Sequence, residues 1–204
     1  MIVLFTDFGV MGPYVGQMKV VLYSRVRGVA VVDLMHDAPT HDPRASAYLL
    51  GALIGEVPAG AICLCVVDPG VGGVRRPLAL QLNGRWLVGP DNGLFELALR
   101  EGGPAATWRI AWKPERLSST FHGRDLFAPV AASLAAGLDP AACGLEPAAP
   151  TRFPDWPEDW PAILYIDHFG NCMTGIKAAE LSPGRTLLAG GQALPGARTY
   201  ADVA

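Results

Sequence analysis

Over residues 2 to 145, short apolar runs alternate with segments of helical periodicity, and this alternation constrains the fold more than any other feature. Such a pattern is typical of βαβ units, in which helices cover a mainly parallel sheet. With 204 residues, half of them hydrophobic, the chain can bury the core that such a domain needs. We therefore predict an α/β domain over residues 1–145. The expected strands are 2–5, 29–34, 62–67, 78–82 and 86–88, and the expected helices are 14–25, 43–56 and 127–136.

The composition changes after residue 144, where prolines become frequent. This change predicts a proline-rich linker over residues 146–161. Residues 162–167 are mostly apolar and begin a new strand. The remainder is punctuated by glycine and proline, so we predict a small, barrel-like β domain over residues 162–204 that is too short to close a barrel by itself.

The charge balance limits the partners that we expect. The chain has 16 basic and 19 acidic residues, and a net charge of −3 gives no general attraction for nucleic acid or an anionic membrane. The sequence begins with a strand-like run instead of a basic leader, and no apolar stretch is long enough to span a membrane. We therefore expect a cytoplasmic protein with neither a nucleic-acid nor a membrane partner.

The cysteines lie mostly in apolar contexts and lack the paired spacing of a zinc site. We expect all of them to be buried free thiols. They are Cys63, Cys65, Cys143 and Cys172.

The segment from Val66 to Arg76 places a carboxylate, a glycine-rich turn and two arginines directly after a predicted buried strand. In open α/β sheets, ligands bind at the loops that follow the strand ends. Asp68 is therefore a candidate site residue that faces a cleft. The alternative is a simple turn, in which Asp68 caps backbone amides while Pro69 and Gly70 reverse the chain.

Three other glycine-containing segments combine polar side chains in the same way, at residues 6–9, 89–93 and 121–125. If all of these segments meet at one sheet edge, they supply carboxylates, a histidine and arginines to one cleft. Each also has a purely structural interpretation. Asp7 and Asp125 would cap helices, Asp91-Asn92-Gly93 would form a turn, and His122 would be a core histidine bonded to a carbonyl.

Two loops carry further candidate ligands. Histidine and aspartate gather at His36, His41, Asp33, Asp37 and Asp42, but their spacing specifies no metal, so we expect a solvated loop and no metal site.

The second loop, residues 167–171, follows the predicted strand of the second module. It is compatible with a β-turn in which Gly170 and Asn171 tolerate positive φ. It is equally compatible with recognition of an amino acid and a base. In that case Asp167 binds an ammonium group, Phe169 stacks on a planar ring and Asn171 pairs with a purine edge.

Taken together, six segments resemble the S-adenosylmethionine (SAM) hydrolase family, also called SAM hydroxide adenosyltransferases, which is related to the fluorinating and chlorinating enzymes that attack SAM. They occur in the family's order and cover nearly the whole chain. The segments are TDFG at 6–9, YVGQMK at 14–19, VDPGVG at 67–72, GPDNGL at 89–94, FHGRD at 121–125 and DHFGN at 167–171.

The resemblance implies an amino-terminal α/β domain, a carboxy-terminal β-barrel domain and a homotrimer with SAM sites between neighbouring subunits. It implies attack of an activated water on the ribose 5′ carbon of SAM, which gives adenosine and L-methionine with SAM as substrate and without a cofactor or metal. The implied catalytic residues are Asp68, Arg75 and His122, of which Asp68 orients and polarises the water. Arg76 is expected to be a helper or solvent-exposed. The implied substrate-binding residues are Asp7, Phe121, Asp167, Phe169 and Asn171.

Two alternatives remain at this point. A SAM-dependent halogenase would use chloride or fluoride in place of water, but an ionised Asp68 would repel a halide. A non-catalytic SAM or adenosine binder is suggested by two departures from the family. Gly12 stands where the family usually has a ribose-binding aspartate, which would shift this role to Asp7, and the family continues beyond residue 204 through a segment that completes the barrel.

Overall fold

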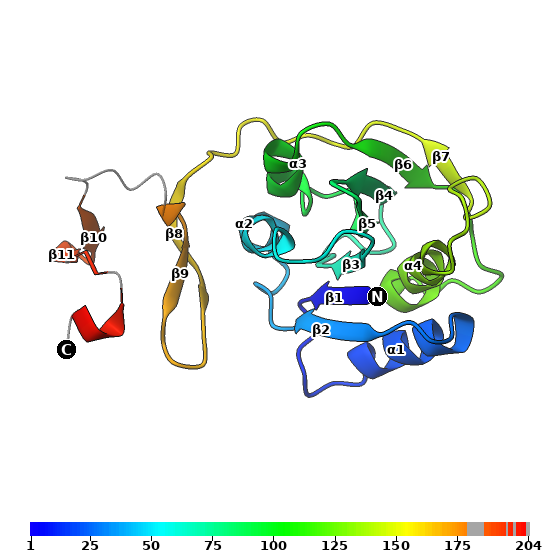
Figure 1. Cartoon of the computed structure of the whole chain (residues 1–204), viewed down its shortest axis with the longest axis horizontal. Helices are drawn as coiled ribbons and strands as arrows, with labels where there is room; N and C mark the ends of the chain where they lie inside the picture. The colour runs from blue at the N-terminus through cyan, green and yellow to red at the C-terminus, as the bar shows by residue number, and fades with distance from the viewer. Residues whose placement is uncertain (179–185, 195, 198, 203–204) are drawn as a thin grey trace.

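The computed structural model describes residues 1–178, 186–194, 196–197 and 199–202. Its centre is a seven-stranded sheet with the order β2-β1-β3-β5-β4-β6-β7 (Figure 1). Strands β2, β1, β3 and β5 are parallel, whereas β4, β6 and β7 each run antiparallel to their neighbours. The predicted α/β class is confirmed. The strands are β1 (Ile2–Thr6), β2 (Val31–Met35), β3 (Ile62–Val66), β4 (Pro77–Leu82), β5 (Arg85–Pro90), β6 (Ala106–Ile110) and β7 (Leu145–Pro147).

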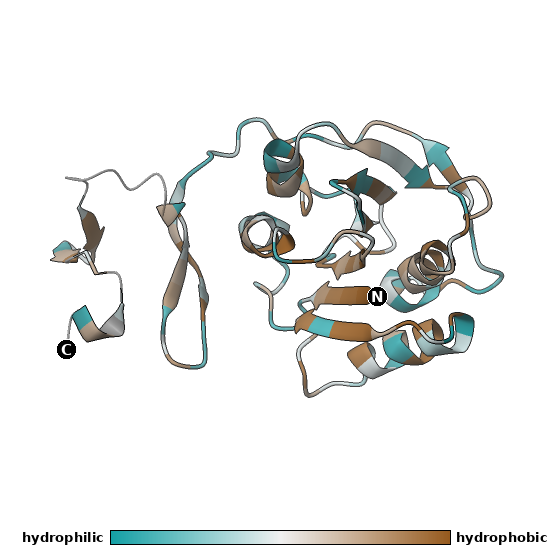
Figure 2. Cartoon of the chain, viewed as in Figure 1, coloured by the Kyte–Doolittle hydropathy of each residue, from teal (hydrophilic) through white to brown (hydrophobic). Residues whose placement is uncertain are grey.

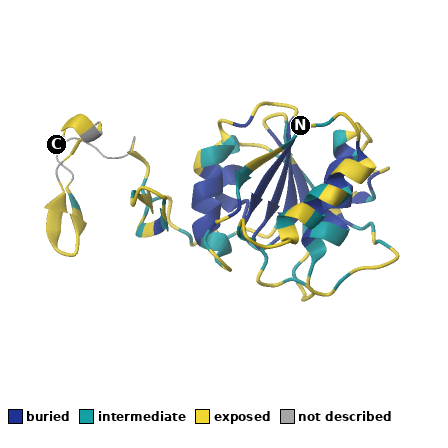
Figure 3. Cartoon of the chain, turned by 90° about the horizontal axis from the view of Figure 1, so that it is seen from below, coloured by how far each residue is buried: buried dark blue, intermediate teal, exposed yellow. Residues whose placement is uncertain are grey.

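Helices cover both faces of this sheet (Figure 3). Ile2 and Leu4 of β1 pack with α1 and α4, whereas Val3 and Phe5 pack with α2 and α3. Alternate side chains of one strand thus enter two different cores, which is why the central strands are apolar throughout (Figure 2). The helices are α1 (Tyr14–Arg25), α2 (Pro43–Ile54), α3 (Glu96–Gly102), the π-helical turn η1 (Gly123–Phe127) and α4 (Ala128–Ala135).

The sequence predicts the long elements of the sheet domain and misses short ones, among them α3, β6 and β7. Helix α3 has only seven residues, and β6 is partly exposed, so neither has a strong apolar period. The hairpin between β4 and β5 turns at Asn83 and Gly84, whose φ angles are 50° and 73°. Positive φ at both positions is the type I′ geometry that an Asn-Gly pair favours.

The proline-rich segment after β7 is fastened to α3. The buried Glu96 carboxylate accepts from Arg152 Nε at 2.9 Å, from Arg100 Nε at 2.8 Å and from the Phe153 backbone N–H at 3.1 Å. Arg100 also donates to the carbonyls of Phe153 and Trp156. Burial by itself raises the pKa of Glu96, but the hydrogen bonds from Arg152 and Arg100 outweigh it and lower that pKa. These hydrogen bonds therefore fix residues 152–156 against α3.

In the carboxy-terminal part, the described residues form two antiparallel hairpins and a short 3-10 helix. The β8–β9 hairpin packs on α2, and its Tyr165 hydroxyl donates to Asp37 at 2.7 Å. The described residues contain no closed barrel, in agreement with the predicted small β region. Its remaining positions, 179–185, 195, 198 and 203–204, lie outside the described residues. The elements are β8 (Trp160–Ile166), β9 (Cys172–Gly175), β10 (Leu187–Ala189), β11 (Gln192–Leu194) and η3 (Tyr200–Asp202).

Three of the cysteines, Cys63, Cys65 and Cys143, are buried free thiols as predicted, whereas Cys172 is exposed on β9, so that expectation is wrong for it. Burial raises the pKa of Cys63 to about 12, so this thiol stays protonated.

None of the helices in the described part of the chain has both the length and the apolar character needed to cross a bilayer.

Candidate active site

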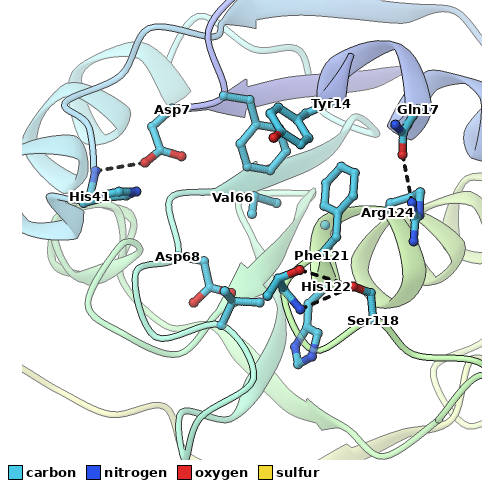
Figure 4. A pocket seen from close by; sticks show the side chains of 14 residues that line it. Asp7, Tyr14, Gln17, His41, Val66, Asp68, Ser118, Phe121, His122 and Arg124 are labelled. Carbon is cyan, nitrogen blue, oxygen red and sulfur yellow. Dashed lines mark hydrogen bonds between the residues drawn. The ribbon is translucent and has the colours of Figure 1, made fainter. Parts of the chain in front are cut away.

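A cavity of about 560 Å³ lies at the carboxyl ends of β1 and β3 (Figure 4). This is the edge at which parallel sheets bind ligands. Four parts of the chain line the cavity: the segment from β1 into α1, the end of β3 with its loop, the loop before α2, and the segment that leads into η1. The lining residues are Asp7, Phe8, Tyr14, Gln17, His41, Val66, Asp68, Val71, Ser118, Thr120, Phe121, His122, Gly123 and Arg124.

The structure brings Asp68, Arg75 and His122 together. Arg75 Nε donates to both oxygens of Asp68, at 2.9 and 3.1 Å, and its Nη2 atom also contacts Oδ2. The same Nη2 atom lies 2.8 Å from His122 Nδ1. The side chains of Asp68 and Arg75 are only 5% and 9% exposed. Arg75 thus bridges two residues of the cavity wall from sequence-distant segments.

The contact between Arg75 and His122 fixes the protonation of the imidazole. A guanidinium group only donates hydrogen bonds, so His122 Nδ1 must accept and the proton of the neutral ring is on Nε2. Burial lowers the pKa of His122, Arg75 lowers it further, and the carboxylates of Asp68 and Asp125 only partly oppose this. His122 is therefore a neutral ring at pH 7.

A glycine allows the segments that carry Asp68 and His122 to meet. Gly72 has a φ of 75°, and a Cβ atom there would collide with the carbonyl oxygen of Ser119. The turn around it is closed by backbone hydrogen bonds from Val71 to Asp68 and from Gly73 to Gly70. Only glycine combines this φ with so close an approach, and the approach sets the Asp68 loop against the segment that carries His122.

The neighbouring arginine has a different partner. Arg76 donates to the Asp91 carboxylate, from Nε at 3.0 Å and from Nη2 at 2.6 Å, and also to the carbonyl of Ala149. Thr151 binds the same carboxylate through its backbone N–H and its hydroxyl. Asp91 therefore anchors the segment after β7, and Arg76 acts as a structural helper outside the trio.

An aromatic cluster forms one wall of the cavity. The rings of Phe8, Tyr14 and Phe121 pack edge to face, with centroid distances of 5.5 to 6.1 Å. Asp7 directly precedes Phe8 of this cluster, and its Oδ2 atom accepts from the His41 backbone N–H at 2.9 Å (Figure 4). Asp7 and Phe121, predicted to bind substrate, thus both line the cavity.

Two structural alternatives are wrong. Asp7 does not cap α1, because the N-cap position of α1 is Pro13 and no side chain caps it. Asp125 does not cap α4 but lies inside η1, where it binds Arg124 and the Ser118 backbone N–H. In both cases, the carboxylate holds a segment of the cavity wall instead of a helix end.

The predicted solvated loop at residues 33–42 is partly buried. Thr6 Oγ1 lies 2.8 Å from His36 Nδ1, and His36 Nε2 lies 2.9 Å from Asp33, which also accepts from Lys19 Nζ at 2.6 Å. His36 is only 6% exposed, so the expectation of a solvated loop is wrong at this position. Among the described residues, no group of three or more histidine, cysteine, aspartate or glutamate side chains is arranged to hold a metal ion.

The three predicted site residues of the second module do not line the cavity of their own chain. Asp167 accepts from the backbone N–H groups of Phe169 and Asn171 and from the Asn171 side chain, which is a well-formed turn. The Phe169 ring at the tip of the β8–β9 hairpin is 85% exposed. Within one chain, the turn at residues 167–171 therefore does not share the cavity of Asp68 and His122.

Several cavity residues were not among the predicted site residues: His41, Gln17, Ser118, Thr120 and Arg124. Gln17 and Arg124 lie within two of the motifs that carry the family resemblance, and this position could have marked them as site residues. His41 has a φ of 56°, a left-handed conformation that is uncommon outside glycine, and no pattern in the sequence indicates it.

Fold and cavity together define an α/β protein with a cavity at the carboxyl edge of parallel strands, where proteins of this class bind small ligands. The chain belongs to the SAM hydroxide adenosyltransferase family. The family's model of the N-terminal domain matches residues 2–144, and its model of the C-terminal domain matches residues 161–204.

Similar proteins agree with this assignment. The (R)-S-adenosyl-L-methionine hydrolase of Thermus thermophilus is 41% identical over 97% of this chain and 82% of its own length. The protein of the same name from Salinispora arenicola is 39% identical over 97% of this chain and 80% of its own length. A fluorinase from Nocardia brasiliensis is more distant, at 26% identity over 88% of this chain and 72% of its own length.

A solved structure has the same fold. A conserved hypothetical protein from Thermus thermophilus superposes with a TM-score of 0.76 and 38% identity, covering 100% of this chain and 83% of that one.

Proposed function

We propose that this protein hydrolyses SAM to adenosine and L-methionine. Relatives at 38–41% identity over most of the chain are named (R)-S-adenosyl-L-methionine hydrolase. The single observation that carries the mechanism is the hydrogen-bonded group of Asp68, Arg75 and His122 at the wall of a cavity large enough for a nucleoside derivative. The class of reaction is displacement at a saturated carbon.

In the proposed step, the oxygen of water forms a bond to the ribose 5′ carbon while the bond from this carbon to sulfur breaks. The electron pair of the broken bond stays on sulfur, which becomes the neutral thioether of methionine. The water proton leaves late, to the Asp68 carboxylate that accepts its hydrogen bond and from there to solvent. The sulfonium is already a good leaving group, so the step needs no cofactor. Alignment of oxygen, carbon and sulfur in a partly enclosed cavity supplies much of the rate enhancement.

Each residue of the trio has a distinct role in this proposal. Asp68 accepts a hydrogen bond from the attacking water and polarises it. Arg75 holds the Asp68 carboxylate through two donors, which fixes the direction in which that carboxylate accepts. The Nε2–H group of neutral His122 donates a hydrogen bond to the water oxygen, so that water is held by one acceptor and one donor.

The cavity wall accounts for the remaining parts of SAM. The rings of Phe8, Tyr14 and Phe121 offer an apolar surface for the adenosyl group. Asp7 accepts hydrogen bonds from the ribose hydroxyls, a role that Gly12 of the same loop cannot take because it has no side chain.

An ionised Asp68 beside the nucleophile favours water over a halide. Two like charges about 4 Å apart repel by roughly 4 kcal/mol at an effective dielectric constant of ~20. Water carries no charge to repel and offers a proton to the carboxylate. This argument favours hydrolysis over the halide chemistry of the more distant fluorinases.

The direct test is incubation of the purified protein with SAM, with and without chloride, followed by chromatography of the products. Adenosine and methionine formed in equal amounts at a rate independent of chloride support the hydrolase. A chlorinated nucleoside would identify a halogenase. SAM binding without any product would identify a non-catalytic binder and overturn the proposal.

The site is completed, in our proposal, by the β8–β9 hairpin of a neighbouring copy in a homotrimer. The cavity is partly open to solvent, and Val10 and Met11, in the loop between the lining residues Phe8 and Tyr14, are 76% and 96% exposed. Phe169, Asp167 and Asn171 of the hairpin do not line the cavity of their own chain. A second copy would place the exposed Phe169 ring and the polar turn over the open side, which buries apolar surface on both partners.

Mixing two inactive variants tests this shared site. We expect Asp68→Asn and the double variant Phe169→Ala/Asn171→Ala to be inactive alone and to regain activity when co-expressed. In a random mixture about one quarter of the sites would combine an intact cavity with an intact neighbouring hairpin. Light scattering on the co-purified protein checks for three copies. If each chain forms a whole site by itself, mixing restores nothing.

We expect the activity to fall in acid because His122 must stay neutral. Burial and Arg75 lower the pKa of His122 below its usual value of 6.5, so kcat/KM should be flat near neutrality and decline with an inflection below 6.5. Protonation of Nδ1 would remove the acceptor of Arg75 and place two cations together. Measurement of kcat/KM from about pH 4.5 to 8 tests this, since an inflection above 6.5 would contradict it.

A further inference from the structure

We propose that Asp125 is a positioning residue that holds the two walls of the cavity at a fixed separation and keeps His122 in its working orientation. This inference rests on the proposed SAM hydrolysis. Asp125 does not line the cavity itself, so it acts through the residues that it binds.

Asp125 is hydrogen-bonded on both oxygens. Oδ1 accepts from Arg124 Nε at 2.6 Å, and Oδ2 accepts from Arg124 Nη2 at 2.9 Å and from the Ser118 backbone N–H at 2.9 Å. The bond to Ser118 closes a loop from residue 118 to residue 125, and the Asp125 backbone N–H bonds the Phe121 carbonyl within it. Phe121 and His122 lie inside this closed loop.

Arg124 connects η1 to α1. Its Nη1 atom donates to Gln17 Oε1 on α1 at 2.8 Å (Figure 4). Its Nε and Nη2 atoms donate to Asp125. The guanidinium carbon lies 5.0 Å from the centroid of the Phe121 ring, which in turn packs on Tyr14. Asp125 thereby fixes an arginine that joins the α1 wall to the His122 wall.

The surroundings of Asp125 also show why a carboxylate is needed. The bidentate contact with Arg124 matches the planar fork of the guanidinium, a geometry that an amide does not reproduce. The segment from Gly123 to Phe127 is a π-helical turn, an irregularity that often occurs at functional sites. Without Asp125, His122 would still contact Arg75, but the turn that carries it would lose the hydrogen bond that closes its loop at Ser118.

Asp125 also affects the charge balance at His122. The charged groups that act on the imidazole are Arg75 and Asp68 from the loop after β3 and Asp125 from η1. The Asp125 carboxylate raises the pKa of His122 and so opposes burial and Arg75. Removal of this negative charge should therefore lower the pKa of His122 further, an effect that a purely structural role would not produce.

The test compares Asp125→Asn, Asp125→Glu and the wild type by steady-state SAM hydrolysis and by NMR titration of the His122 ring, assigned with His122→Gln. We expect Asp125→Asn to lower kcat by roughly 10- to 100-fold, as for a small misplacement of a catalytic group. The acid inflection of kcat/KM and the NMR pKa of His122 should both move to lower pH. Asp125→Glu should restore the NMR pKa and part of the rate.

The matched control is Glu146→Gln, which removes a carboxylate from the exposed ion pair with Arg109 on the β6–β7 edge. It should change neither kcat nor the His122 titration. Thermal unfolding of each variant separates loss of function from loss of fold. A folded Asp125→Asn with wild-type kcat and an unmoved His122 pKa would overturn the inference, whereas a wild type that makes no adenosine would instead overturn the proposed function.

Discussion

Replacement of Asp68 by asparagine is expected to lower kcat for adenosine formation by about two to four orders of magnitude. The amide is nearly isosteric with the carboxylate, but it carries no charge and presents one oxygen where Arg75 now binds two. It would hold the attacking water less firmly and polarise it less. The KM for SAM should change little, because Asp68 acts on the water and not on the bound substrate. Initial rates from chromatography of adenosine give both constants.

The control for Asp68→Asn is again Glu146→Gln, which removes one carboxylate far from the cavity. Its rate should equal that of the wild type. A thermal unfolding curve should show that Asp68→Asn is folded at the assay temperature. Retention of kcat within about threefold of wild type in a folded Asp68→Asn protein would contradict a role for this carboxylate in water activation.

The largest expected effect on stability comes from Glu96, whose side chain is 1% exposed between Arg100 and Arg152. Glu96→Gln removes the charge that both arginines and the Phe153 backbone N–H share. We expect a loss of about 3 kcal/mol in the free energy of unfolding, since a broken buried pair leaves an uncompensated charge. For a chain of this length, the corresponding fall in Tm is roughly 6–12 °C.

The stabilisation by Glu96 should depend on pH. The pKa of Glu96 is lowered in the fold, so its stabilisation is complete above the usual glutamate value of 4.5 and is lost as the pH falls through the folded value. The difference between wild type and Glu96→Gln in urea unfolding should therefore be largest near pH 7 and shrink in acid. Glu146→Gln should cost less than about 1 kcal/mol, because its ion pair is half exposed. Equal losses in both variants would contradict the importance of burial at Glu96.

The strands and helices that could be predicted from sequence are those with a long apolar signal. The segments at β1, β3, α1, α2 and α4 bury continuous or periodic apolar faces, so local pattern and final environment agree. The elements that were missed depend on neighbours instead. Strand β7 has three residues in a proline-rich segment and exists because it pairs with β6.

For the candidate site too, local sequence predicts some features and packing between distant segments sets the others. The resemblance of the sequence motifs to the family predicts Asp68, Arg75 and His122 as the catalytic residues. How these three side chains meet depends on the folded chain. Arg75 and His122 are far apart in the chain, and their contact requires the close approach that Gly72 permits at Ser119.

Which polar residues have a structural role and which face the cavity also depends on the tertiary structure. His36 and His41 occur in one short segment with similar neighbours, yet His36 is buried against Thr6 and His41 lines the cavity. The same holds for the two adjacent arginines, since Arg75 binds Asp68 and His122 whereas Arg76 binds Asp91. Residue type and spacing define what a side chain can do, but its partners come from segments distant in the sequence, and these are set only when the whole chain packs.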